Sequence, residues 1–300
     1  MAERGFRRDR KKLDLGKYTL VTYKDTRGER FEIIVDPWAA VRYKRGEKIS
    51  PDEVIVIEEV FKDVQKGILA SIQDLRQIVF EGALSKFQEK KGRGATKKEV
   101  EQIRRQVEEL EEDELKKYAT RWILEDGELK LPDEVRDKLL EEKINKIVNF
   151  LAKFAINPAT NAPYPRSKIS EAIKKIFAGI KLGDKKIHIV VDPLAKDIRP
   201  ILPKVLDALK MIMPIRIEAI ECRIWVPPAY SGKVYSLIAH YGNVLKADWL
   251  DDGSVNVIAE VPAGLFLQLS NEIRKATKGS YRIEIIARRT EEEILRGKVS

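Results

Sequence analysis

The chain has 300 residues, of which 43% are hydrophobic and 35% are charged, and its formal net charge is +9. This length suits two or three domains with buried cores, and the basic excess favours a polyanionic partner. The longest apolar runs are too short to cross a bilayer, and the basic N-terminus lacks the apolar stretch of a secretory signal. Cys222 is the single cysteine, so an internal disulfide is excluded. We therefore expect a cytoplasmic protein with no membrane partner.

Residues 1–17 contain seven basic and three acidic residues and almost nothing apolar to pack. We expect an extended or disordered basic arm. Arms of this kind can become ordered on nucleic acid, and the alternative is a solvated tail.

Residues 18–127 are expected to form a small α/β domain. Alternation and turn residues predict strands at 18–23, 30–35 and 60–64, and helices at 37–45, after Ser50 and at 71–80.

Within this domain, residues 83–112 differ in pattern from their surroundings. Thr96 to Glu99 form a capping box after a glycine-containing basic link, and a narrow apolar stripe follows at Val100, Ile103, Val107 and Leu110. The pattern predicts a protruding helical hairpin with one solvent-exposed face.

Residues 128–214 predict a central three-helix domain. The first helix starts at Pro132-Asp133-Glu134, the second spans 166–177, and the third spans 194–211. Between the first two helices, residues 155–165 hold three prolines and two asparagines, which predict a rigid turn because proline ends a helix and asparagine bonds to nearby backbone.

Residues 215–300 give the clearest fold pattern. The expected order is strand 215–226, helix 229–241, strand 243–250, strand 254–260, helix 263–276 and strand 281–287, with a short trailing helix at 291–296. Asp251-Asp252-Gly253 is expected to be the hairpin turn between the middle strands. This βαββαβ order predicts a ferredoxin-like domain, so the fold class of the whole chain is multidomain α+β.

Residues that carry catalytic chemistry are scarce. His188, His240 and Cys222 are too few for a standard zinc site, and no phosphate-binding loop or nucleophile elbow occurs. His188 is expected to pack in an apolar strand, and Cys222 lies within a predicted strand. We therefore predict a protein that is not an enzyme and has no metal and no cofactor. An RNA-modifying enzyme, the alternative, would depend on Cys222 or His188.

Basic residues recur instead at expected turns and helix ends. Lys and Arg bind phosphates, and nearby tyrosines can stack on unpaired bases. The alternative is an ordinary basic surface. The candidate RNA-binding residues are Arg4, Arg7, Arg8, Arg10, Lys11, Lys12, Lys24, Arg27, Arg30, Arg42, Lys44, Arg45, Lys66, Arg274, Lys275 and Lys278.

Several motifs spread along the chain carry a family resemblance. They are Arg30-Phe31-Glu32-Ile33, residues 60–67 (VFKDVQKG), residues 123–128 (ILEDGE), residues 156–164 (INPATNAPY) and Thr277-Lys278-Gly279. In this order and spacing they resemble the Shwachman–Bodian–Diamond syndrome protein family, in an archaeal-type member. Residues 83–112 are an insertion relative to that family, and the basic arm has little similarity to it.

The resemblance implies a FYSH-like N-terminal domain, a central three-helix domain and a ferredoxin-like C-terminal domain. It also implies a monomeric ribosome maturation factor that binds large-subunit rRNA near the peptidyl-transferase centre. With an elongation-factor-two-type GTPase as its partner, such a factor promotes release of the anti-association initiation factor six. An RNA-processing adaptor, for example an exosome accessory protein, is the alternative function.

Overall fold

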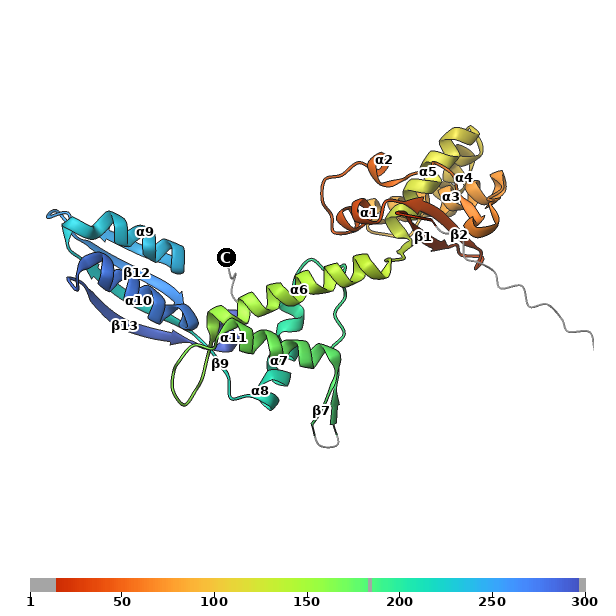
Figure 1. Ribbon diagram of the computed structural model, residues 1–300. Helices are drawn as coiled ribbons and strands as arrows, with labels where there is room; N and C mark the ends of the chain where they lie inside the picture. Colours follow the sequence, from red (N-terminus) through yellow and green to blue (C-terminus); the bar gives the residue numbers. More distant parts are fainter. Residues whose placement is uncertain (1–14, 183–184, 297–300) are drawn as a thin grey trace, which may run out of the picture. The chain divides into compact units, whose positions relative to one another are not determined.

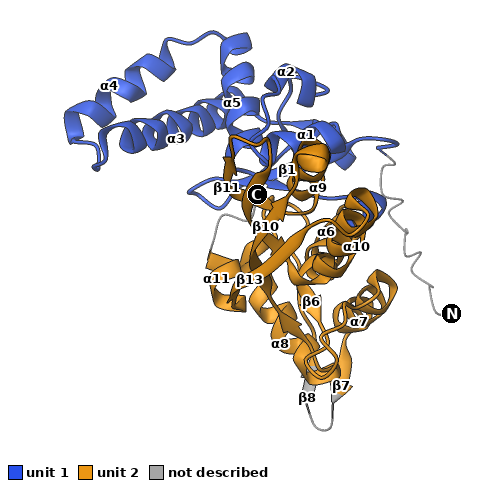
Figure 2. Cartoon of the chain, turned by 90° about the vertical axis from the view of Figure 1, so that its left-hand side faces the viewer, with its two compact units in different colours: residues 1–138 blue, residues 139–300 orange. Residues whose placement is uncertain are grey.

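The computed structural model describes residues 15–182 and 185–296. The chain divides into two compact units, residues 1–138 and residues 139–300 (Figure 2). Each unit combines helices with sheet. Among the described residues, no helix is both long enough and apolar enough to cross a membrane.

Unit 1 contains a five-stranded sheet with the order β4-β3-β2-β1-β5. The strands are β1 (Thr19–Lys24), β2 (Arg30–Val35), β3 (Phe61–Asp63), β4 (Ile68–Leu69) and β5 (Glu128–Leu129). All neighbouring strands are antiparallel. β1 and β2 form the predicted hairpin, and Gly28 in its turn has φ +87°, a value that favours glycine. The predicted domain boundary at 127/128 falls directly before β5, which pairs with β1.

The helices of unit 1 have strong start and stop signals. They are α1 (Pro37–Lys44), α2 (Pro51–Val54), α3 (Ile72–Lys91), α4 (Lys97–Glu108) and α5 (Glu112–Asp126), with a 3-10 turn at Val64–Lys66. Asp36 caps α1, and Ser50, Ser71 and Thr96 form capping boxes at α2, α3 and α4. Phe31, Ile33, Ile78, Leu115 and Ile123 are among the fully buried side chains of this unit.

Helix α3 continues far beyond its predicted end near residue 80. Gly82, a poor helix former, lies just beyond that predicted end. A Cβ on Gly82 would lie 2.7 Å from the indole of Trp122, so the glycine lets α5 pack directly against α3. This packing offsets the low helix propensity. As a result, Lys90 and Lys91 lie in the last turn of α3, and Gly92 ends the helix with φ +64°.

Residues 83–112 contain the predicted second helix, α4, after the last turns of α3. Its apolar stripe is the part that packs, since Ile103 and Val107 are buried while most other α4 side chains are exposed. The guanidinium of Arg104 lies 4.5 Å from the centre of the Phe80 ring on α3. Helices α3 and α4 therefore form a hairpin with one solvent-exposed face.

Unit 2 begins within a long helix and has two apolar cores. Around the first core lie α6 (Asp133–Phe154), α7 (Arg166–Ala178), α8 (Leu202–Ile212) and α11 (Glu291–Arg296), as Figure 1 shows. Two short antiparallel pairs accompany them, β6 (Ala155–Ile156) with β9 (Arg216–Ile217), and β7 (Ile180–Leu182) with β8 (Lys185–Ile187). Leu151, Ile173 and Leu206 are fully buried in this core.

The third helix of this region starts later than predicted. Residues 194–198 are not helical, Arg199–Ile201 form a 3-10 turn, and α8 follows at Leu202. Pro200 and Pro203 lack an N–H, so they fit only at the start of such elements. Upstream, Asp192 accepts a hydrogen bond from the N–H of Leu194 at 2.9 Å, which favours a turn over a helix.

The proline-rich stretch 155–165 is an ordered loop with an exposed tip. The N–H of Asn157 donates to the carbonyl of Ala162 at 2.9 Å, and Asn161 has φ +54°. The side-chain oxygen of Asn161 accepts from Arg216 at 2.8 Å, and the Tyr164 hydroxyl donates to the carbonyl of Pro214. The loop is thus fixed to the chain that enters β9.

The second core of unit 2 lies under a four-stranded antiparallel sheet with the order β11-β12-β10-β13. Its elements are β10 (Ala219–Val226), a 3-10 turn (Pro228–Tyr230), α9 (Ser231–Tyr241), β11 (Asn243–Trp249), β12 (Val255–Pro262), α10 (Ala263–Thr277) and β13 (Arg282–Arg289). Helices α9 and α10 pack on one face, and their Val234, Ile238, Leu269 and Ile273 are fully buried (Figure 1). Gly253, with φ +81°, completes the expected turn between β11 and β12.

The single strand predicted at 215–226 is divided into β9 and β10. Between them, the N–H of Glu218 donates to Phe154 at 3.1 Å and its carbonyl accepts from Ala263 at 3.0 Å. The chain therefore pairs first with β6 and then with β12 and β13. The first core ends and the second begins at this switch, since Ala219 belongs to one and Ile220 to the other.

Candidate nucleic-acid interface

The turn between β1 and β2 fixes a cation at one end of unit 1. The carboxylate of Asp25 accepts the N–H groups of Arg27 at 3.0 Å and Glu29 at 2.9 Å. The same carboxylate also accepts the Arg27 guanidinium at 2.7 Å. Local side-chain bonds of this kind hold a turn in one conformation. Arg27 is therefore held in place at the tip of the hairpin.

A buried carboxylate on α3 holds two cations of this end. Asp74 lies 3.3 Å from the guanidinium of Arg27 and 3.0 Å from the ammonium of Lys62. Burial by itself raises the pKa of Asp74, but hydrogen bonds from Ser71 and Lys62 outweigh it and lower this pKa to about 2. Asp74 is therefore ionised at neutral pH and shared between both cations.

A second carboxylate, on β2, holds another pair. Glu32 lies 2.6 Å from the guanidinium of Arg30 and 3.7 Å from the ammonium of Lys130, and it accepts the N–H of Val64 at 3.1 Å. Asp74 and Glu32 are 5% and 7% exposed, whereas their four cations are about half exposed. The cations of both groups are therefore already positioned, which lowers the ordering cost of binding phosphate. The Glu32 group carries a net positive charge, whereas the Asp74 group does not, because Arg27 also pairs with Asp25 at 2.7 Å and Lys62 lies 3.8 Å from Glu29.

Exposed apolar residues adjoin these cations. Residues 65–73 are exposed except for Ala70, and Ile68, Leu69 and Ile72 are 46%, 49% and 45% exposed. Such neighbouring apolar side chains are typical of contact surfaces. We call the combined set the hairpin surface: Lys24, Arg27, Arg30, Lys62, Lys66, Ile68, Leu69 and Ile72. The sequence analysis did not identify Lys62 as a candidate, because its link to Arg27 depends on Asp74, which lies on a helix distant in sequence.

The remaining predicted cations of unit 1 have different settings. Lys66 pairs with Asp63 at 2.6 Å, and Arg42 with Glu47 at 3.0 Å. The ammonium of Lys44 donates to the carbonyls of Glu125 at 2.9 Å and Gly127 at 2.6 Å, and burial lowers its pKa. Arg45 caps α1 at its C-terminal end. Lys44 thus stabilises the end of α5, a role that its sequence context did not indicate.

Six predicted RNA-binding residues of the arm lie outside the described residues. They are Arg4, Arg7, Arg8, Arg10, Lys11 and Lys12.

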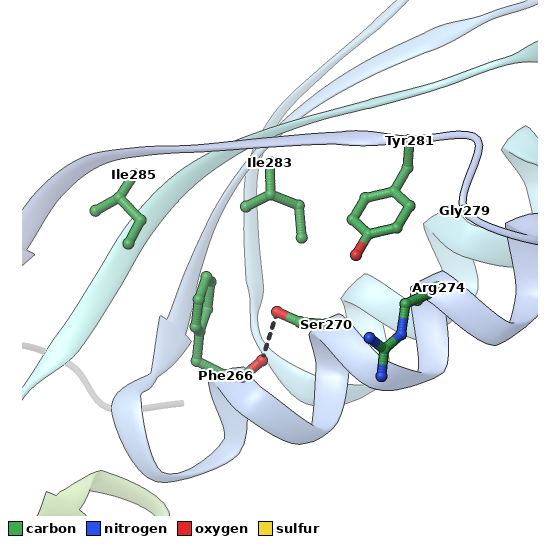
Figure 3. Close-up of a pocket in the computed structure, with 7 residues that line it drawn as sticks. All are labelled: Phe266, Ser270, Arg274, Gly279, Tyr281, Ile283 and Ile285. Atoms are coloured by element: carbon green, nitrogen blue, oxygen red, sulfur yellow. Dashed lines mark hydrogen bonds between the residues drawn. The ribbon is translucent and has the colours of Figure 1, made fainter. Parts of the chain in front are cut away.

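The predicted cations of unit 2 gather where α10 ends. Arg274 donates to Asn271 at 2.9 Å, Lys275 pairs with Glu272 at 3.1 Å, and Lys278 ends the helix with φ +53°. Beside them a groove of about 540 Å³ runs between α10 and β13. Figure 3 shows Phe266, Ser270 and Arg274 along the helix, with Ile283 and Ile285 on the strand across from it and Tyr281 just before the strand begins. The groove therefore joins apolar walls to a guanidinium.

The residues considered for catalysis do not form a site. Burial raises the pKa of the Cys222 thiol to about 11, so the thiol is protonated and a poor nucleophile at neutral pH. His188 is exposed, so its predicted packing role is wrong; the run that contains it emerges from β8 as surface chain. Asp252, a residue of the expected hairpin turn, accepts the hydroxyl of Ser254 at 2.6 Å and so stabilises that turn. In residues 15–182 and 185–296, no group of His, Cys, Asp and Glu side chains is placed to hold a metal.

Fold and surface together define a mixed helix-and-sheet protein whose candidate site is a basic and apolar surface. The family model for the Shwachman-Bodian-Diamond syndrome (SBDS) N-terminal domain matches residues 17–83, and that for the SBDS protein, C-terminal domain, matches residues 220–288. The chain belongs to the SBDS protein family.

Relatives of archaea and animals match nearly the whole chain. The "Ribosome maturation protein SDO1 homolog" of Aeropyrum pernix is 28% identical over 89% of this chain and 95% of its own length. The protein of the same name from Methanothermobacter thermautotrophicus is 29% identical over 87% of this chain and 94% of its own. The "Ribosome maturation protein SBDS" of Caenorhabditis elegans is 23% identical, over 91% and 90%.

Proposed function

We propose that this protein is a cytoplasmic ribosome maturation factor without enzymatic activity of its own. The observation that carries the proposal is the match to ribosome maturation proteins over about nine tenths of both chains. It covers both units and includes the segment that forms the hairpin surface. A role in ribosome biogenesis therefore fits the whole chain.

We propose further that the partner on the ribosome is large-subunit rRNA near the peptidyl-transferase centre. Three cations of the hairpin surface, Arg27, Arg30 and Lys62, are positioned by Asp74 or Glu32 and remain open to solvent. Fixed cations suit a phosphate backbone, and the adjoining Ile68, Leu69 and Ile72 suit contact with bases or with ribosomal protein. The surface thus supports binding to a folded RNA target.

The finer parts of the proposal concern domains and partners. Unit 2 would combine a three-helix domain with a ferredoxin-like domain, a view supported by its two cores and its β11-β12-β10-β13 sheet. An elongation-factor-two-type GTPase would supply nucleotide hydrolysis, and initiation factor six would leave the subunit as a result. The protein would act as a monomer and need no cofactor.

Co-sedimentation with purified large subunits at moderate salt tests the proposal. Lys24→Glu/Lys66→Glu should reduce binding strongly, because both reversals place anionic groups on the hairpin surface. Lys97→Glu/Lys98→Glu makes the same change in net charge on exposed positions of α4, so binding should be nearly unaffected. Failure of the unaltered protein to co-sediment, with or without the GTPase, would sink the proposal.

A second measurement separates the maturation role from RNA processing. Initiation factor six should leave the subunit only when this protein, the GTPase and GTP are all present. Crosslinking to free transcripts in place of large-subunit rRNA would favour the exosome-type adaptor instead.

A further inference from the structure

The C-terminal sheet of unit 2 has one face that neither α9 nor α10 covers. Along β10, Cys222, Ile224 and Val226 are fully buried on the helix side. Side chains alternate along a strand, so Arg223 and Trp225 point to the opposite face. Arg223 is exposed and Trp225 is partly exposed. A tryptophan on the open face of a central strand is unusual enough to need an explanation.

Strand register places Trp225 in a row with three polar side chains. It lies opposite Arg282 on β13 and Asn256 on β12, and Asn256 lies opposite Asp248 on β11. The guanidinium carbon of Arg282 is 5.8 Å from the centre of the indole ring. Directly paired residues on one face are close enough to interact, so the row forms a continuous strip across the sheet.

The next row partly encloses this strip. Arg223 lies opposite Glu284 and Ile258, and its guanidinium bonds to Glu284 at 2.9 Å. Residues of the two rows, together with Ile283 of β13, line a shallow hollow of about 590 Å³; they are Arg223, Trp225, Asn256, Arg282, Ile283 and Glu284.

The charges in the hollow are not equivalent. Arg223 is paired with Glu284, whereas Arg282 makes no ion pair among the described residues and its guanidinium lies near the indole. An unpaired guanidinium beside an aromatic ring is complementary to a phosphate attached to a flat base. The Asn256 amide, in the same row, can both donate and accept hydrogen bonds at a base edge. The three groups therefore match the phosphate, the base face and the base edge of one nucleotide.

We infer that this open face binds single-stranded RNA, with one base stacked on Trp225 and its phosphate held by Arg282. Stacking on aromatic side chains is the general way in which proteins hold unpaired bases. The site lies outside every cation cluster named from the sequence. The inference adds an RNA contact in unit 2 to the proposed function, and it rests on that function.

The test uses the full-length protein and a fluorescein-labelled RNA decamer, single-stranded or paired with its complement. Trp225→Ala should bind the single strand about 5- to 150-fold more weakly, the cost of losing one stacked base. Trp225→Phe should retain most of the affinity, because the phenyl ring still stacks. Trp249→Ala is the matched control: that tryptophan is exposed too, but its ring packs 5.9 Å from Tyr235 of α9 on the covered face.

A salt titration isolates the phosphate contact. Arg282→Ala should reduce the slope of log affinity against log salt by about 0.7, the value for one phosphate on a single strand. Arg288→Ala, a control on the same strand whose guanidinium pairs with Glu218 at 3.0 Å, should leave the slope unchanged.

Three outcomes would overturn the inference: equal affinity of Trp225→Ala and Trp249→Ala, equal binding of single strand and duplex, or an acidic peptide that quenches Trp225 fluorescence where the decamer does not. Circular dichroism and the melting temperature of each variant exclude unfolding. Co-sedimentation of Trp225→Ala with large subunits separates this inference from the proposed function. If the variant binds both the subunit and the decamer as the unaltered protein does, the inference is wrong and the proposed function still stands.

Discussion

The ammonium of Lys44 donates a 2.6 Å hydrogen bond to the carbonyl of Gly127, at the residue that ends α5. Lys44 also binds the carbonyl of Glu125, so one cation satisfies two acceptors that a helix end leaves unpaired. The position of Lys44 at a basic helix end suggests a contact with RNA, but its hydrogen bonds indicate that it stabilises the fold. The two roles are separable by experiment.

Lys44→Met should lower the free energy of unfolding of unit 1 by about 1–3 kcal/mol, because it leaves the carbonyl of the buried Gly127 without this donor. Lys24→Met, at an exposed strand end, should change it by less than about 0.5 kcal/mol. Urea unfolding measures both. Salt dependence of RNA binding should respond in the opposite way, with a reduced slope for Lys24→Met alone. A stable Lys44→Met protein with weak RNA binding would show that the sequence prediction was right.

The Asp74 network predicts a dependence of stability on pH. Its pKa is lowered from 3.8 to about 2 in the folded protein. The ionised form is therefore favoured by folding, and this stabilisation is complete above about pH 4 and lost as the pH falls towards 2. Asp74→Asn should cost on the order of 2 kcal/mol at neutral pH.

Guanidinium unfolding of both proteins between pH 7 and pH 2.5 measures this difference. The gap between them should narrow markedly at the acid end, because protonation of Asp74 begins to remove its stabilisation there. A gap that stays constant across the range would mean that packing, and not charge, accounts for the cost of the substitution.

Gly264 predicts a severe response to the smallest substitution. A Cβ at this position would lie 2.6 Å from the main-chain oxygens of both Ala152 and Lys153. Gly264→Ala should lower stability by about 1–3 kcal/mol, because backbone atoms cannot move aside as a flexible side chain can. Gly232→Ala is its control within the same unit: nothing lies within 4 Å of that Cβ, so the change should be neutral or slightly stabilising. Melting temperatures compare the pair.

Removal of residues 1–14 should weaken large-subunit binding and flatten its salt dependence. These residues carry six basic and three acidic side chains and little that could join a core. Each phosphate contact that is lost reduces the slope by up to about 0.9. The melting temperature should not change. An unaltered slope would identify the arm as a tail without an RNA contact.

Local pattern predicted most elements of this protein, and its misses have different causes. Asp-Gly marked the β11–β12 turn, and capping boxes marked the starts of α2 and α4. The end of α3 was misplaced because the fit of Gly82 depends on Trp122, far along the chain. Helix α8, the third helix of unit 2, starts later than the spacing of apolar residues predicted. Local turns and two prolines keep the chain before it from being helical.

The candidate sites show the same limit more strongly. Counting basic residues located Arg27 and Arg30 but could not reveal that Asp74 and Glu32 hold them in place. Lys62 and Lys130 were missed because each is recruited by a carboxylate from another element. Trp225 was missed because its importance lies in the register of three strands. Its position between the buried residues Ile224 and Val226 was the one local signal of an outward-facing aromatic ring.

The contact at Gly264 also has a mechanical meaning. At this position the backbone at the start of α10 packs directly against the backbone at the end of α6, and no flexible side chain lies between them. A force applied to the C-terminal sheet, for example by a nucleotide seated on Trp225, would pass into the last turn of α6 with little loss. Interiors packed this closely transmit strain and do not absorb it. The end of α6 and the sheet should therefore behave as one lever arm, and flexing should begin elsewhere.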